Sequence, residues 1–377
     1  MQLSKTIKLI LTREQRTMLL SVMAEYIRTV NSLVEVSHSG TSIQKYTSAN
    51  VSANLPSAMK NQCIRDAKSI LRKHNKALKA SEKENRFRIL RCEKPKPEPK
   101  IPVLRKLCCY INNQNFSISE HSIEFPVMIS GKSRRISVAA EITGEQWNTL
   151  KDAKLGTLRV VVKNGKMVAN IAYEFREKDV LSSRNTMGVD LGIKCPAVSH
   201  ISDGSVKFYG NGRRNKYLRR RFDARRRKLQ KAKHRSAIKK TRNKEQRIMK
   251  DIDHKLSREI VNTAIAHKVS VIKLERLSNI RSATRKSRKN NHGLHNWSFY
   301  RLASFIEYKA KMAGITVRYV NPAYTSQKCP MCGKRSHAQD RNYFCSCGFH
   351  CHRDLVGAMN IEVSTECVGG SNARRAA

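Results

Sequence analysis

The chain of 377 residues has room for two or three domains, and its 40% hydrophobic residues are enough to build packed cores. Lys and Arg number 75 against 29 Asp and Glu, which gives a formal net charge of +46 at pH 7. Repulsion on this scale opposes compaction unless a polyanion neutralises it, and nucleic acid is the polyanion we expect. An anionic membrane surface could also balance the charge, but no apolar run approaches the roughly 18 residues that a membrane-spanning helix needs.

The N-terminus and the cysteines both predict a reducing, cytoplasmic setting. Residues 1–11 are interrupted by Lys5 and Lys8, and they lack the apolar block and cleavage site of a secretory signal. Five of the 11 cysteines lie between Cys329 and Cys351, while the other six are scattered. This distribution favours one metal site over a disulfide scaffold.

The first part of the chain predicts one strand and two helices. Residues 3–11 alternate as a strand does, and apolar residues then recur at helical spacing over residues 20–34, which predicts a core-facing stripe. After a loop rich in Ser, Thr, Asn and Gly at 37–53, Pro56 favours the first turn of a helix that continues to about Ala77. The many basic residues of this helix could face phosphates or solvent, and the sequence leaves both open.

A β-rich region follows. The spaced prolines of residues 94–102 exclude a helix and mark a segment boundary. Asn164-Gly165 lies between two apolar runs and predicts a hairpin. Together these strands predict a small barrel, which the N-terminal strand could complete; they are expected at 117–125, 136–142, 157–162 and 167–175.

A second architecture begins near Met187. Residues 188–198 predict a strand, Asp203-Gly204 a turn, and residues 205–209 the returning strand. A helix is expected over 252–267, and a buried strand then runs to Glu275. Strands that alternate with helices indicate an α/β sheet.

The most basic segment lies inside this second architecture. Between Arg213 and Arg247 there are 18 Lys or Arg, against Asp223 and Glu245 alone. A solvated helical face would be the ordinary interpretation, but cationic density this high favours contact with phosphates.

A second basic stretch, residues 281–289, precedes His295 and several aromatic residues. Aromatic rings beside cations can stack on bases. The partly helical spacing of Trp297, Phe299 and Phe305 nevertheless favours a place in the core over a stacking role for Tyr300 and its neighbours.

Three carboxylates stand in apolar or basic surroundings, and each has an ordinary interpretation when taken alone. Asp190 could cap a turn, and Glu275 could pair with Arg276. Asp354 could simply favour the N-terminus of a helix expected over 355–361. Taken together, acids from separate elements are what two-metal phosphoryl chemistry requires, in which two Mg²⁺ ions about 3.5 to 4 Å apart activate water and stabilise the leaving oxygen.

A cysteine cluster predicts a zinc ribbon. Two close pairs of thiolates could hold a tetrahedral Zn²⁺, and four protein ligands leave no open position, so its role would be structural. The second pair is tighter than the usual two-residue gap, so His337, His350 or Cys351 could replace one ligand. The pairs are Cys329 with Cys332 and Cys345 with Cys347.

Several stretches resemble the TnpB family, the transposon-encoded, RNA-guided nucleases that are related to type V CRISPR effectors. The resemblance extends from about Met187 to Ile361, and before that it rests on the order of the elements. The stretches are Gly188-Val-Asp-Leu-Gly-Ile, Lys273-Leu-Glu275, residues 297–317, residues 322–333, and Cys347-Gly-Phe-His-Cys-His-Arg-Asp354.

The resemblance implies roles for individual residues. Asp190, Glu275 and Asp354 match the family's three RuvC-type acids, which an RNase H-like sheet carries and which bind Mg²⁺. The zinc ribbon is inserted before the last acid and helps to handle the target strand. Its Cys345-Ser-Cys347 pair is shorter than the family's common pair.

The resemblance also implies an organisation: a multidomain α/β protein plus a β-barrel. A RuvC-like nuclease domain would carry the inserted zinc ribbon, and an N-terminal wedge-like β-barrel would carry a helical insert. The N-terminal parts would bind a guide RNA derived from the transposon end and a short motif beside the target in double-stranded DNA. The expected ranges are 1–11 and 96–182 for the barrel, 12–95 for the helical recognition insert, 183–322 and 351–377 for the nuclease domain, and 323–350 for the zinc-ribbon module.

The resulting prediction is an RNA-guided DNA endonuclease that cuts at one Mg²⁺-dependent RuvC-type site. In such an enzyme base pairing supplies sequence specificity, while the protein contacts backbones and a short motif. Three alternatives remain: a guided DNA-binding regulator that does not cleave, a zinc-ribbon RNA-binding protein without catalysis, and a DNA transposase that uses the same metal chemistry for strand transfer.

Overall fold

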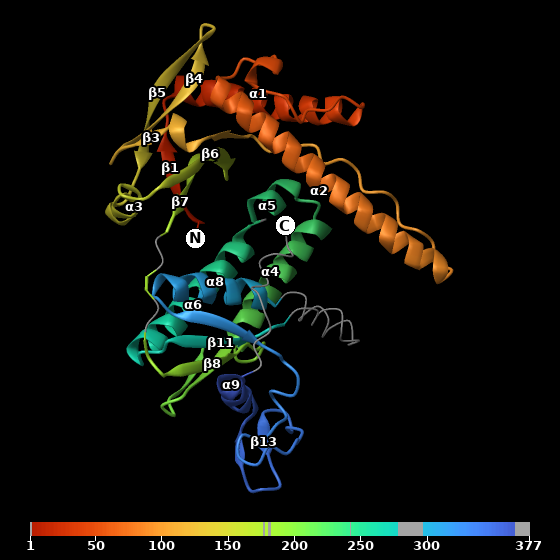
Figure 1. The fold of residues 1–377 in the computed structure, drawn as a ribbon, viewed down its shortest axis with the longest axis vertical. Coiled ribbons are helices and arrows are strands. Elements are labelled where there is room, and N and C mark those ends of the chain that lie inside the picture. The colour runs from red at the N-terminus through yellow and green to blue at the C-terminus, as the bar shows by residue number, and fades with distance from the viewer. Residues whose placement is uncertain (1, 176–177, 180–181, 242, 278–296, 366–377) are drawn as a thin grey trace. The chain divides into compact units, whose positions relative to one another are not determined.

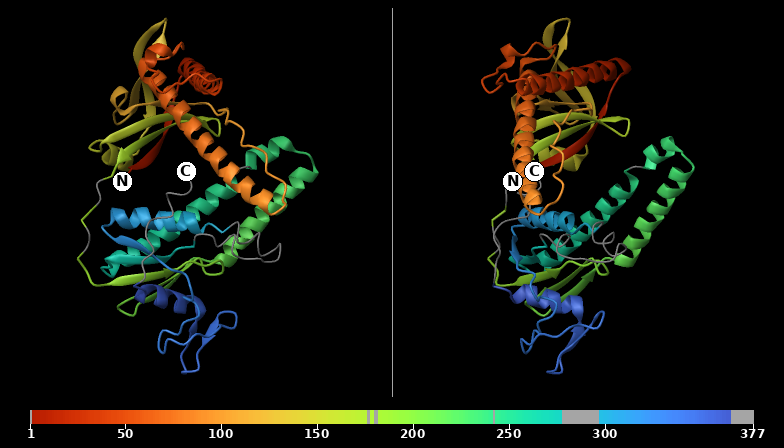
Figure 2. Two further views of the ribbon diagram at one scale, coloured as in Figure 1. Left: turned by 45° about the vertical axis from the view of Figure 1, so that its right-hand side comes forward. Right: turned by 90° about the vertical axis from the view of Figure 1, so that its right-hand side faces the viewer.

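A computed structural model describes residues 2–175, 178–179, 182–241, 243–277 and 297–365 (Figures 1 and 2). The chain divides into two units, Met1–Phe175 and Arg176–Ala377, each with its own core. The predicted basic stretch at 281–289 and His295 lie outside the described residues.

One antiparallel sheet organises the first unit. Its order is β2-β6-β7-β1-β5-β4-β3, so the N-terminal strand β1 lies in the middle and pairs with both β7 and β5. Among the described residues no pairing joins the edge strands β2 and β3, so a closed barrel remains a prediction. The strands are β1 (Gln2–Ile10), β2 (Cys108–Ile111), β3 (Ser117–Ile118), β4 (Ser122–Ile129), β5 (Lys132–Glu141), β6 (Leu155–Lys163) and β7 (Lys166–Glu174).

Two turns of this sheet test the sequence prediction. The hairpin at Asn164-Gly165 is confirmed, because both residues have positive φ, +52° and +77°, as a tight hairpin turn requires. The single strand expected over 117–125 is wrong, because the chain reverses between β3 and β4. There the backbone N–H of Ser119 donates to the carbonyl of Ser122, and the N–H of Ser122 donates back to the Ser119 hydroxyl.

Two long helices pack beside this sheet. Helix α1 (Arg13–His38) begins at Thr12, whose side chain forms a capping box with Gln15. Helix α2 (Ser57–Leu90) runs well beyond the expected end at Ala77. The buried residues of α2 end at His74, so its C-terminal half has no apolar face from which a helix could be predicted. This half is rich in Ala, Leu, Lys, Glu and Arg, which have high helix propensity. A short helix, α3 (Gly144–Leu150), was not expected.

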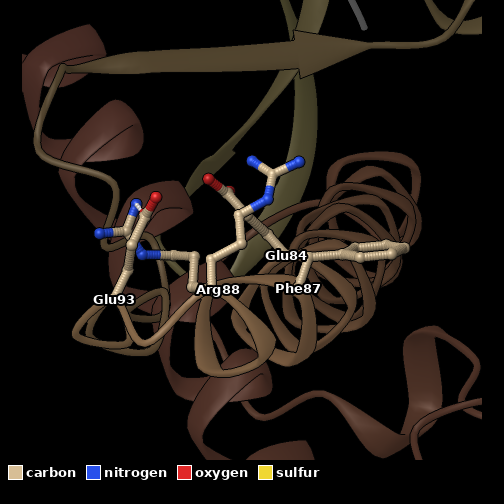
Figure 3. Close-up of a pocket in the computed structure, with 5 residues that line it drawn as sticks. Glu84, Phe87, Arg88 and Glu93 are labelled. Carbon is tan, nitrogen blue, oxygen red and sulfur yellow. Dashed lines mark ion pairs between the residues drawn. The ribbon is translucent and has the colours of Figure 1, made fainter.

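The end of α2 is tied to the extended segment that follows it (Figure 3). Asn85 exchanges two hydrogen bonds with the backbone of Lys96, at 2.8 and 2.9 Å, and Arg88 donates to the carbonyl of Lys94. Glu84, Phe87, Arg88, Arg91 and Glu93 line a hollow of about 340 Å³ here, and Arg88 pairs with Glu93.

A mixed five-stranded sheet forms the centre of the second unit. Its order is β10-β9-β8-β11-β12, with β8, β11 and β12 parallel and β9 and β10 antiparallel. Helices α6 and α8 cover one face and α9 the other (Figures 1 and 2). The elements are β8 (Thr186–Asp190), β9 (Ala197–Ile201), β10 (Val206–Tyr209), α4 (Gly212–Lys231), α5 (Arg235–Thr241), α6 (Lys244–Ala266), β11 (Val271–Glu275), α8 (Phe299–Met312), β12 (Thr316–Val320) and α9 (Arg353–Val363).

The strand expected over 188–198 is divided in the structure. Strand β8 ends at Asp190, and a tight loop precedes β9. The N–H of Gly192 donates to the carbonyl of Pro196, and a Cβ on Gly192 would lie 2.5 Å from the carbonyl oxygen of Cys195. The apolar residues of the loop mimic a strand, but only glycine fits this close approach.

A two-stranded hairpin, β13 (Asn342–Phe344) and β14 (His350–His352), lies between β12 and α9 in the chain. Strand β14 runs directly into α9, so the hairpin and the helix are joined without a linker. None of the helices among the described residues combines the length and apolar character that crossing a membrane demands.

Candidate active site and zinc centre

The three predicted acids end or begin elements that the sheet brings together. Asp190 is the last residue of β8 and Glu275 the last of β11. Leu274 pairs with Val189 in parallel register, so both acids lie at the same edge of the sheet. Asp354 is in the first turn of α9, where its backbone N–H donates to His352 Nδ1 at 3.2 Å.

Two glycines let α9 approach the sheet closely enough to bring Asp354 to this edge. A Cβ on Gly188 would lie 2.2 Å from the carbonyl oxygen of Ala358 in α9, so only glycine fits at that point of β8. A Cβ on Gly357 would lie 3.1 Å from Asp190 Oδ2. The Asp190 carboxylate therefore rests against the helix that carries Asp354.

The acids interact electrostatically. Burial raises the pKa of the Asp190 carboxyl well above its ordinary value, and the negative charges of Glu275 and Asp354 raise that pKa further. Burial also raises the pKa of Glu275, whereas the hydrogen bond from the Thr325 hydroxyl lowers it. Because the charges of Glu275 and Asp354 oppose the ionisation of Asp190, a cation at this edge would favour the ionised form of Asp190.

Arg341 supplies a positive charge next to the acids. Arg341 donates to both carboxylate oxygens of Asp354, at 2.7 Å to Oδ2. The Nε of Arg341 has no hydrogen-bond partner among the described residues. The hydrogen bonds from Arg341 to the Asp354 carboxylate are therefore the ones that hold its guanidinium in place. Asp190 and Glu275 remain partly accessible to solvent. An oxygen-rich site that draws in a guanidinium is chemically suited to a hard divalent cation such as Mg²⁺.

The structure brings the four cysteines of the predicted zinc ribbon together. Their sulfur atoms all lie within 4.8 Å of one another, with Cys329 Sγ 3.7 Å from Cys347 Sγ and Cys332 Sγ 3.4 Å from Cys345 Sγ. Four thiolates at about 2.3 Å from a tetrahedral Zn²⁺ have sulfur atoms about 3.8 Å apart, so the arrangement fits this ion. Among the described residues, this group does not include His337, His350 or Cys351.

Thiolate formation is favoured at one of these ligands. The backbone N–H of Cys347, together with neighbouring thiols, lowers the pKa of Cys345 to about 6. Zinc binds thiolates rather than thiols, so this pKa suits a ligand.

The segment that contains the four cysteines is connected to the acids by polar contacts. Lys194, in the loop after Asp190, pairs with Asp340 at 2.7 Å. Arg341, the next residue, contacts Asp354 as described, and its carbonyl accepts the N–H of Arg353. The same short turn before β13 therefore contacts both Asp354 and the loop that follows Asp190.

Two family models match the chain. Residues 299–361 match the Cas12f1-like TNB domain, and residues 170–281 match a model described as a probable transposase. These ranges include all three acids and all four cysteines of the site.

Curated relatives point the same way. The chain is 36% identical over 163 residues to the TnpB-like protein MJ0751 of Methanocaldococcus jannaschii, which covers 41% of this chain and 58% of that protein. It is 29% identical over 220 residues to the CRISPR-associated endodeoxyribonuclease Cas12f1 of Sulfoacidibacillus thermotolerans, which covers 53% of this chain and 51% of that protein. The chain thus spans a little over half the length of these relatives.

The fold also resembles a solved structure, that of the Cas12f1–sgRNA–target DNA complex. The protein chain of that complex is 16% identical, with a TM-score of 0.63 over 95% of this chain and 84% of the other. At this identity the likeness concerns the fold.

Proposed function

The chain belongs to the family of TnpB-like proteins, and we propose that it is an RNA-guided DNA endonuclease that hydrolyses target DNA at a single Mg²⁺-dependent site. The observation that carries this proposal is the placing of Asp190, Glu275 and Asp354 around one edge of the mixed sheet. The endodeoxyribonuclease named among the relatives supports the choice of DNA as substrate.

The strand order supports a RuvC-type, RNase H-like domain. The first strand of the sheet, β8, lies in its centre and carries Asp190, and the adjacent parallel strand β11 carries Glu275. The third acid comes from the last described helix. Two strand-end acids and one helix acid around an open edge are suited to binding metal beside a phosphodiester.

Asp190, Glu275 and Asp354 would hold Mg²⁺ in this proposal. Bound there, Mg²⁺ supplies activation of the attacking water and stabilisation of the leaving oxygen. The residues of the chain orient the ligands: Thr325 holds Glu275, His352 fixes the first turn of α9, and the glycine contacts keep α9 against β8. The four thiols would hold a structural Zn²⁺ that keeps the hairpin β13–β14 folded beside the acids.

The nucleic acid would be held largely through its backbone. In α4 only Gly212 is buried, and the exposed basic side chains of this helix that have no acidic partner would contact phosphates. A guide RNA from the transposon end would pair with one strand of a DNA duplex, and the unit Met1–Phe175 would contact the guide and a short motif beside the target. In this scheme two parts bind the nucleic acid: the wedge-like barrel (1–11 and 96–182) and the recognition insert (12–95). The nuclease domain (183–322 and 351–377) and the zinc-ribbon module (323–350) bind the strand that is cut and hydrolyse its phosphodiester bond.

A cleavage assay tests the proposal. The full chain, loaded with the RNA that co-purifies with it, is mixed with a duplex complementary to that RNA, with Mg²⁺ or with EDTA. We expect cleavage only with Mg²⁺ and a loss on the order of 10²-fold or more for Asp190→Ala. Asp251→Asn removes an exposed carboxylate paired with Lys255 and is the matched control, which should cut normally.

Each contrary outcome identifies an alternative. Guided binding without cutting by the unaltered chain would favour a DNA-binding regulator. Joined rather than cut products would indicate a transposase. Heterogeneous cellular RNA and no guided binding would leave an RNA-binding protein.

A further inference from the structure

A polar hollow of about 560 Å³ lies beside the candidate active site, and no step described so far uses it. Its walls come from the loop that follows β12, from the segment between the first two zinc-cluster cysteines and β13, and from the end of α9. The residues that give it its chemistry are Tyr324, Thr325, Lys328, Arg335 and Asn360.

The hollow is connected to two of the three acids. Thr325 donates its hydroxyl to Glu275, so one wall residue directly contacts a candidate metal ligand. Asn360 is on the same helix as Asp354 and donates to the carbonyl oxygens of Thr325 and Lys328, each at 2.7 Å. The loop is therefore pinned to α9, and the hollow keeps a fixed position relative to the acids.

A flat cationic surface forms one wall. The guanidinium of Arg335 lies 3.5 Å from the centre of the Tyr324 ring, and Tyr324 is 49% exposed. Nucleobases stack on aromatic rings and on guanidinium planes, and cation–π attraction adds to such stacks. Lys328 and Arg335 have no carboxylate partner among the described residues, so their charge is available to a phosphate.

The backbone at Tyr324 supports a binding role. Its φ is +63°, a left-handed conformation that costs free energy for a bulky residue. Two N–H groups, from Gln327 and Lys328, donate to its carbonyl and hold the conformation. The result is a half-exposed aromatic ring on a turn that these two hydrogen bonds hold in place.

We infer that this hollow binds one nucleotide of the single DNA strand that is being cut, with its base on the Tyr324–Arg335 pair and its phosphate beside Lys328. Asp354 and Asn360 are six positions apart on α9, which places the hollow about 9 Å along the helix from the acid. That distance equals about three base steps of stacked strand, so the nucleotide is a near neighbour of the scissile bond. The inference rests on the proposed function for the identity of the strand, but the binding itself is independent of cleavage.

Photo-crosslinking tests the inference. The full chain carrying Asp190→Ala is mixed without divalent metal with a single-stranded deoxyoligonucleotide that contains one 5-iodouracil, then irradiated, and the crosslinked peptide is identified by mass spectrometry. We expect the peptide with Tyr324 to be the crosslinked one at salt concentrations that suppress non-specific binding. Arg335→Gln should lower its yield about 5- to 100-fold, the range that the loss of one stacking contact gives.

The controls separate binding from folding. Lys334→Gln removes a neighbouring exposed charge that does not line the hollow, and its crosslink should be unchanged. Tyr324→Phe keeps the ring and should retain binding in a fluorescence anisotropy assay, whereas Tyr324→Leu should lose it. Zinc content measured in every variant shows whether the cysteine cluster is intact.

Four outcomes overturn the inference: crosslinks spread over many peptides with none at Tyr324, an equal loss for Lys334→Gln, a loss of binding in Tyr324→Phe equal to that in Tyr324→Leu, or a preference for the matching RNA oligonucleotide. A Tyr324 crosslink in a chain whose unaltered form never cuts DNA would keep the nucleotide site and overturn the proposed function. DNA cleavage without a Tyr324 crosslink would keep the proposed function and overturn the nucleotide site.

Discussion

Asp190 illustrates the energetic cost of assembling the site. Its carboxylate rests against α9, and the charges of Glu275 and Asp354 oppose its ionisation, while Arg353 and Arg341 offset only part of this. An acid whose pKa is raised by folding destabilises the folded state wherever the unfolded chain has already lost its proton. A bound cation would offset the repulsion between the carboxylates, so this repulsion favours metal binding.

We therefore expect Asp190→Asn to stabilise the metal-free protein. In EDTA at pH 7 we expect the free energy of unfolding to rise by about 0.5 to 2 kcal/mol, measured by chemical denaturation. The gain should disappear as pH falls below about 4, because Asp190 is then protonated in both folded and unfolded states. A variant less stable than the unaltered chain at pH 7 would contradict the argument. Asp251→Asn, at an exposed ion pair, should change little.

The residues of the site differ in how far sequence could reveal them. Glu275 ends an apolar run and Asp354 precedes a helical one, so their positions at element ends could be predicted. Asp190 was expected inside a strand over 188–198, whereas it is the last residue of β8. Arg341 could not, because it is one of 75 basic residues and its role depends on a turn that only the folded hairpin creates. Thr325 acts through a contact 50 positions away in the chain, which no local pattern encodes.

We expect the hairpin β13–β14 to depend on a bound Zn²⁺ more than on its own core. Among the described residues its buried cluster consists of Cys329, Tyr343 and Val356, with Ala338, Cys345, Phe349 and Cys351 partly buried against it. With so small a core, binding of Zn²⁺ to the four thiolates would supply most of the free energy that orders this segment. Loss of the metal would therefore release the turn that places Arg341 on Asp354.

Cysteine substitution tests this dependence. Cys332→Ser should lose the zinc, about one ion per chain, and should open residues 323–352 to limited proteolysis, while Met1–Phe175 keeps its resistance. Cys351→Ser is the matched control and should retain zinc, because Cys351 lies outside the sulfur cluster. Zinc loss in Cys351→Ser comparable to that in Cys332→Ser would instead make Cys351 a ligand.

The elements that sequence analysis placed wrongly share a cause. Helix α2 was predicted too short because its far half buries nothing, and periodicity reports burial rather than helix formation. The strand over 188–198 was predicted too long because an apolar loop follows β8 without a polar break. The end of helix α6 and the end of strand β11 were placed to within one residue, whereas α6 begins at Lys244, eight residues before the expected start at 252, in a first turn that buries nothing. The sequence pattern therefore predicted the boundaries of an element only where its residues are buried on at least one face.

At the scale of the whole molecule, the net charge of +46 governs how nucleic acid is held. In α4 the side chains of Arg219 and Arg226 pair with Glu245, but Arg220, Arg225 and Arg227 are exposed and have no acidic partner among the described residues. Each phosphate contact releases counterions, so affinity falls steeply as salt rises. The free arginines of α4 should therefore contribute to the salt dependence, while paired basic residues should not.

Replacing Arg220, Arg225 and Arg227 with Gln tests this distinction. We expect the slope of log affinity against log salt, measured by anisotropy on duplex DNA of arbitrary sequence, to become shallower by about 2 to 3. The matched control replaces Lys154, Lys255 and Lys311, which already pair with Glu174, Asp251 and Glu307. Both variants lose three positive charges, so an equal change in slope would mean that net charge alone governs binding. A smaller change in the control would place the phosphate contacts on α4, because only charges that meet phosphates displace counterions from them.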